Sequence, residues 1–177
     1  MKKITLLFTL LLLAMWISPL SFATAVAKVM AAPATVDLHD YWDQRCASCH
    51  GHAANFARHF LRIENDVLMG AHHQGNLAVF LRNHYLSDAL VAPVSAMLKA
   101  QVLSQPLFND KCASCHGKAS AFARQSLRMQ DGVLVTAADG RRVADYLATH
   151  GRLQAHEIPI LVESLKRVRT EVASPAQ

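Results

Sequence analysis

The sequence predicts a mainly α-helical protein that contains two tandem copies of one small unit, each with a short β-hairpin. A shift of 66 residues places residues 46–51 (CASCHG) on residues 112–117 (CASCHG) without a gap. Apolar residues before each of these motifs follow helical spacing. Asp131-Gly132 lies between two strand-like segments, which favours a hairpin with a type I′ turn. A segment present twice indicates two copies of a small domain rather than a solenoid.

The repeat continues beyond the motif and sets the expected boundaries. Phe56-Ala57-Arg58 matches Phe122-Ala123-Arg124, and Pro93 matches Pro159. We predict units at 36–103 and 104–169, with almost no linker near 101–105, and a flexible tail at 170–177. The elements expected in each unit are a helix leading into the motif, hairpin strands (127–130 and 133–136 in the second copy), a short helix (77–84 or 143–150) and a closing helix (88–102 or 154–168). Ser87 is a candidate cap for the first closing helix, which kinks or begins at its proline.

Residues 1–27 have the pattern of a secretory signal peptide. Lys2 and Lys3 precede an apolar run at 4–17, and small residues follow at Ala23, Ala25 and Ala27. Residues 28–35 then form a linker. The alternative is an uncleaved membrane anchor, because the apolar stretch is long enough to span a bilayer. Both interpretations predict an exported protein, either free in the periplasm or attached to the inner membrane.

Composition and charge limit the classes of partner. The chain is 52% hydrophobic, which is sufficient for a packed core, and its formal charge is +5. Lys2 and Lys3 contribute two of these charges and belong to the leader. No basic run with interleaved aromatic residues is present, so the sequence does not indicate nucleic-acid binding.

The pattern Cys-x-x-Cys-His is typical of covalent haem attachment. The four thiols of Cys46, Cys49, Cys112 and Cys115 would bind two haem c groups, and the adjacent His50 and His116 would ligate iron. Covalent attachment also staples units whose cores are too small to be very stable alone. A redox disulfide, or one zinc ion held by both cysteine pairs, is the alternative. Neither alternative accounts for the histidine that follows each pair.

A second repeated histidine predicts the other axial ligand. His84 and His150 each lie 34 residues after the motif histidine. The other candidates after His116 are His156 and Met129, whose matching positions hold Leu90 and Ile63. We therefore expect bis-histidine ligation of both irons, by His50 with His84 and by His116 with His150. The alternative is a pair of helix-end histidines that interact with the last carbonyl groups of a helix.

Four repeated arginines are candidates for binding haem propionates. Arg58 and Arg124 match each other, as do Arg62 and Arg128. Their spacing of four residues would place each pair on one face of a helix, and a guanidinium group suits a carboxylate. A solvated helix face explains the spacing equally well.

These motifs resemble the class I cytochrome c family. The resemblance includes the aromatic residues Trp42 and Phe108, four residues before the first cysteine of each motif, both haem motifs and the closing helices. Leu38 and Ser104 occupy positions where that family usually has glycine. The resemblance implies two tandem cytochrome c-like units that transfer electrons.

The expected function is one-electron transfer between periplasmic or membrane redox partners, without substrate chemistry. Two histidine ligands predict a lower reduction potential than a histidine–methionine pair gives. The alternatives are a haem enzyme, such as a dihaem peroxidase, and a redox or gas sensor in which the distal histidine is displaceable.

Overall fold

The computed structural model describes residues 36–71 and 75–172, and most of them are helical. The predicted leader at 1–27, the linker at 28–35 and residues 173–177 lie outside this part of the chain. The described residues belong to one compact unit. Within the described ranges, no helix has the length and apolar character needed to cross a bilayer.

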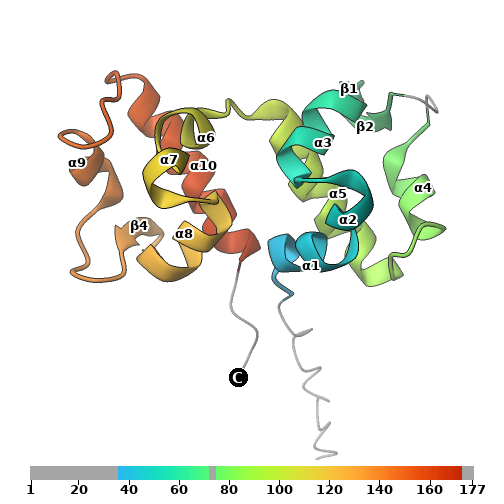
Figure 1. Cartoon of the computed structure of the whole chain (residues 1–177), viewed down its shortest axis with the longest axis horizontal. Coiled ribbons are helices and arrows are strands. Elements are labelled where there is room, and N and C mark those ends of the chain that lie inside the picture. The colour runs from blue at the N-terminus through green and yellow to red at the C-terminus, as the bar shows by residue number, and fades with distance from the viewer. Residues whose placement is uncertain (1–35, 72–74, 173–177) are drawn as a thin grey trace, which may run out of the picture. The chain divides into compact units, whose positions relative to one another are not determined.

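The two halves of the sequence fold into the same series of elements, seen as two groups in Figure 1. We call residues 36–103 the first repeat and residues 104–172 the second repeat. The first contains α1 (Leu38–Arg45), α2 (Ala47–His50), α3 (Ala53–Phe60), β1 (Leu61–Glu64), β2 (Val67–Gly70), α4 (Leu77–Arg82) and α5 (Asp88–Leu103). The second contains α6 (Leu107–Lys111), α7 (Ala113–His116), α8 (Ala119–Ser126), β3 (Leu127–Gln130), β4 (Val133–Thr136), α9 (Val143–Leu147) and α10 (Glu157–Glu171).

The two hairpins form where the sequence predicts them. Strand β1 pairs antiparallel with β2, and β3 pairs antiparallel with β4. Asp131 and Gly132 both have positive φ, at 49° and 76°, as a type I′ turn requires. Asn65 and Asp66 take the same conformation in the first repeat, at 47° and 65°. Turn chemistry thus fixes both hairpins at the same register.

Helix ends differ more between the repeats, because their caps differ. The Asp37 carboxylate accepts hydrogen bonds from two N–H groups at the start of α1, whereas α6 begins after Pro106 with no side-chain cap. Ser87 is the residue before α5, but its side chain forms no capping bond. Helix α5 continues through Pro93.

The closing helix of the second repeat is longer at its end than predicted. Helix α10 continues to Glu171 and so includes the first two residues of the predicted tail, because Val168 and Val172 are both buried. At its other end it starts at Glu157, which places Pro159 in the first turn, where proline is tolerated.

Each repeat has its own hydrophobic core. The first core is centred on Val94, Met97 and Leu98, all of which are at most 1% exposed. Leu161 and Leu165 of α10, 1% and 2% exposed, are among the most buried residues of the second core. Ala57 and Ala123 are completely buried in matching positions on α3 and α8. The small side chain lets each of these helices pack closely against the closing helix of its repeat.

Polar contacts join the repeats. The Arg124 guanidinium on α8 binds the Asp37 carboxylate at 2.6 and 3.0 Å and Asp40 at 2.6 Å. Lys118 binds Asp43 at 2.8 Å. These ion pairs attach α1 of the first repeat to the second repeat.

Candidate haem sites

Each cysteine motif forms a single helical turn that ends in its histidine. Cys46 is both the C-cap of α1 and the N-cap of α2, and Gly51, with a φ of +68°, ends α2 directly after His50. In the first repeat, the Trp42 indole N–H donates to the Gly51 carbonyl at 2.9 Å, which fixes this turn. Helix α7 has the same form between Cys112 and Gly117.

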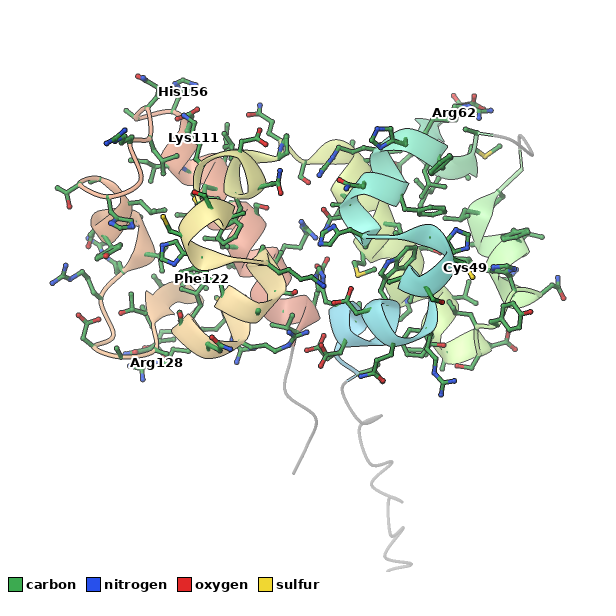
Figure 2. All side chains as sticks on the ribbon, in the orientation of Figure 1. Cys49, Arg62, Lys111, Phe122, Arg128 and His156 are labelled. Carbon is green, nitrogen blue, oxygen red and sulfur yellow. The ribbon has the colours of Figure 1, made fainter. Side chains whose placement is uncertain are left out.

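The two cysteines of each motif differ in burial. Cys46 and Cys112 are half-buried, whereas Cys49 (Figure 2) and Cys115 are exposed. Burial raises the pKa of both half-buried thiols. All four thiols are free. The two thiols of each motif therefore lie beside the same histidine, at different depths.

The two histidines of each predicted pair lie opposite each other with nearly the same geometry. The ring centres of His50 and His84 are 6.0 Å apart, with an angle of 64° between the planes. Those of His116 and His150 are also 6.0 Å apart, at 63°. A metal between two imidazole nitrogens, with bonds of about 2 Å each, gives ring centres about 6 Å apart. Both pairs therefore have the separation that one shared metal ion requires.

Aromatic rings hold these imidazoles in place. Phe56 lies 4.7 Å from His50, and Phe122, labelled in Figure 2, lies 4.8 Å from His116. On the distal side, Phe80 stacks on His84 at 4.7 Å. The corresponding Tyr146 is 4.7 Å from His150. Desolvation, with the charge of His84 as a smaller cause, lowers the pKa of His50 and so favours the neutral imidazole that binds metals.

The hairpin and the following short helix position each distal histidine. A backbone bridge pairs Met69 with Asn76 in the first repeat, and Val135 with Arg142 in the second. These bridges anchor the starts of α4 and α9. His84 and His150 follow the ends of those helices, where their backbone N–H groups bond to helix carbonyls. Neither imidazole donates to a carbonyl of the described residues, so the alternative role as a helix-end side-chain cap is not seen.

A cavity of about 750 Å³ separates the histidines of the second repeat. This volume is within the range of about 300–1,000 Å³ that is common for cofactor pockets. Its lining includes Cys112, Cys115, His116 and His150, with Leu161 and Leu165 behind them. The lining thus combines the predicted attachment and ligand residues with an apolar wall, which suits a flat, largely apolar cofactor.

The four arginines do not gather around this cavity. Arg62 and Arg128 lie on strands β1 and β3, so the prediction that each shares a helix face with Arg58 or Arg124 is wrong. The local cause is that helices α3 and α8 end before them, at Phe60 and Ser126. Figure 2 shows Arg62 and Arg128 on the hairpins.

Each arginine has another contact instead. Arg62 binds Glu64 at 2.6 Å, and Arg128 donates to the Ala137 carbonyl at 3.4 Å. Arg124 is held by α1 of the other repeat, as described above. Arg58 donates to the Gln101 carbonyl at 3.4 Å and lines a second cavity of about 490 Å³.

Two basic residues that sequence reasoning passed over do line the larger cavity. Lys111 (Figure 2) directly precedes Cys112, and Arg152 follows His150 by two residues. The position that matches Lys111 in the first repeat holds Arg45, so the repeat alone indicates a basic residue directly before each cysteine motif. Arg152 has no such counterpart, because the matching residue is Leu86. A search restricted to repeated residues therefore could not find Arg152.

The donor set fits haem better than zinc. Among the residues that the structure describes, no three histidine, cysteine or acidic side chains are grouped as a metal-ion site would require. The two cysteine pairs are consequently not gathered into one tetrahedral zinc site. A haem iron needs only two protein ligands, and each repeat provides two imidazoles beside two thiols.

Comparison of the chain with protein-family models, curated proteins and solved structures finds no match.

Proposed function

We propose that this chain is an exported dihaem c-type cytochrome, with tandem units like those of class I cytochromes c, that carries single electrons between redox partner proteins. The observation that supports this most is the duplicated histidine geometry. Two imidazoles with ring centres 6.0 Å apart occur beside a Cys-x-x-Cys motif in both repeats. A structural role for any one histidine would not require the same pairing twice.

The residues of each repeat have separate roles in this proposal. The two cysteines of each motif would hold a haem through thioether bonds, and the two histidines of that repeat would bind its iron. Phe56 and Phe122 pack against the proximal imidazoles and help to fix their orientation. When bound, haem supplies a one-electron Fe(III)/Fe(II) couple. Each repeat then takes one electron from a reduced donor protein and passes one to an oxidised acceptor protein.

The second imidazole in each repeat favours electron transfer over substrate chemistry, because it would leave no open position on a bound iron. An enzyme or gas sensor needs an open or displaceable iron position, whereas both repeats offer a second imidazole. The protein is therefore expected to be low-spin, with potentials below those of a histidine–methionine cytochrome. The N-terminal segment directs the chain to the periplasm, and an uncleaved segment would anchor it to the inner membrane.

Replacement of the distal histidines tests the proposal. The full chain, produced with the haem-ligation machinery, should gain the mass of two haem groups and should not bind carbon monoxide. His84→Ala and His150→Ala should each bind one carbon monoxide per molecule, because one axial position is opened.

Matched controls are available in both repeats. His59 is exposed and bonds to the Asn55 carbonyl, and His156 is exposed at the start of α10. His59→Ala and His156→Ala should leave the spectrum unchanged. A bare-polypeptide mass would overturn the haem proposal. Binding of carbon monoxide by the unmodified protein would favour the sensor or enzyme alternative.

A further inference from the structure

The cavity of the second repeat is lined by one charged group that the protein does not neutralise. Three charged side chains line it: Lys111, Asp139 and Arg152. The Lys111 ammonium binds the Glu157 carboxylate at 2.7 Å. The Asp139 carboxylate accepts hydrogen bonds from the Thr136 hydroxyl and from a backbone N–H. Arg152 forms no hydrogen bond or ion pair with any residue in the ranges 36–71 and 75–172.

The backbone holds Arg152 beside the distal ligand in an uncommon conformation. Gly151 and Arg152 have φ values of +86° and +51°, directly after His150. A left-handed conformation is infrequent for a residue other than glycine and persists where the surroundings impose it. Leu153, the next residue, packs against the second hydrophobic core. His150 and Leu153 therefore hold both ends of the turn that places Arg152 at the cavity.

The first repeat has no equivalent charge. Leu86 occupies the matching position and packs against the first core. The aromatic surroundings of the two histidine pairs are otherwise similar, with a ring close to the proximal and to the distal imidazole of each. Arg152 is thus a charge of the second site that its sequence counterpart in the first repeat lacks.

We propose that Arg152 binds a carboxylate of the cofactor in the second cavity and makes this site a stronger electron acceptor than it would be without that charge. This inference rests on the proposed haem function. A fixed positive charge favours the state with one more electron, because reduction lowers the positive charge of the centre. For a unit charge about 10 Å away at an effective dielectric constant of about 20, Coulomb's law gives roughly a tenfold effect on the redox equilibrium. Exposure of Arg152 to solvent reduces this to about threefold to tenfold.

Potentiometric titration of the full dihaem protein tests this, with dithionite as reductant and ferricyanide as oxidant. Arg152→Gln should weaken electron binding at one of the two haems by about threefold to tenfold and leave the other unchanged, and tenfold corresponds to 59 mV for a one-electron couple. Arg152→Lys should retain most of the wild-type value. Arg128→Gln removes a charge from the same repeat outside the cavity and should leave both potentials unchanged.

Two outcomes would overturn the inference: unchanged potentials in Arg152→Gln, or an equal shift in Arg128→Gln. The mass of the same samples separates these outcomes from failure of the haem proposal. A chain with two haems and unshifted potentials refutes only the role of Arg152, whereas a chain without haem refutes the function on which it rests.

Discussion

Replacing Asp37 with asparagine or alanine separates two roles of its carboxylate. The carboxylate caps α1 by accepting hydrogen bonds from the N–H groups of His39 and Asp40, at 3.0 and 2.9 Å. It also binds the Arg124 guanidinium of the other repeat through two hydrogen bonds, at 2.6 and 3.0 Å. The Asp37 side chain is only 11% exposed and that of Arg124 is 29% exposed, so solvent screens this pair less than most surface pairs. Asparagine preserves the cap but removes the charge.

The expected losses of unfolding free energy differ between the two variants. Asp37→Asn should lose about 1–2 kcal/mol, since hydrogen bonds to charged groups contribute about 1.5–3 kcal/mol and Arg124 keeps its bond to Asp40. Asp37→Ala should lose about 1 kcal/mol more, the typical effect of removing an N-cap. At this chain length, each kcal/mol lowers the melting temperature by about 2–4 °C. Thermal unfolding followed by circular dichroism at pH 7 measures both losses.

The stability difference should depend on pH in a defined direction. Burial alone would raise the pKa of Asp37, but hydrogen bonds from Arg124 and the Asp40 N–H, with the charges of Arg124 and His39, lower it below its ordinary value. A lowered pKa in the folded state stabilises the protein above the ordinary pKa, and this stability is lost as pH falls through the folded-state pKa. The stabilities of the wild type and Asp37→Asn should therefore begin to approach each other near pH 4, the ordinary pKa of aspartate, and should converge as the pH falls through the lower pKa of the folded state.

An exposed ion pair between the same repeats provides the control. Asp43 and Lys118 are 35% and 55% exposed, and Asp43→Asn should cost about 0–1 kcal/mol. The reasoning fails if Asp37→Asn is as unstable as Asp37→Ala, because the cap would then contribute nothing and loss of the ion pair would account for the whole effect. It also fails if the gap between the wild type and Asp37→Asn is the same at pH 7 and at pH 3.

Two further predictions concern the local structure of the repeats, and urea unfolding measures both. Gly132→Ala should cost about 1–2 kcal/mol, because Gly132 has a φ of +76°, whereas Gly70→Ala should be close to neutral, since that glycine lacks a positive φ and an added Cβ meets open space. Trp42→Phe should cost about 1–2 kcal/mol through loss of the hydrogen bond to the Gly51 carbonyl and loss of buried volume. The second repeat folds with Phe108 at that position, so Trp42→Phe should retain its haem; loss of attachment would contradict this reasoning.

Local chemistry explains which elements the sequence could predict. Strands β3 and β4 have the predicted bounds because Asp131-Gly132 alone specifies the turn, and the alternation of side chains then fixes the register. Helix ends were less accurate because they depend on capping bonds that composition does not reveal. Ser87 illustrates this, since it occupies the N-cap position of α5 without making the bond that makes serine a good cap.

Long-range contacts explain what the sequence could not predict. Arg124 was a candidate for binding the cofactor, but it binds Asp37, which is 87 residues away in the chain. No periodicity or spacing indicates a partner at that distance. Arg152 was overlooked for a related reason, because its place at the cavity depends on how the turn after α9 packs against the core.

Residues that match between the repeats are of two kinds: some are positioned entirely by their own repeat, and others have a partner in the other repeat. His84 and His150 have the same surroundings because every element that positions them, from the hairpin to the short helix, belongs to their own repeat. Arg58 and Arg124 also match in sequence but differ in contacts, because only Arg124 faces α1 of the other repeat. Repetition is therefore strong support for a shared role only where one repeat contains the whole local structure. Where the neighbouring repeat supplies the partner, matching residues acquire different roles, and the unmatched ones, such as Arg152, are where the two sites can differ in function.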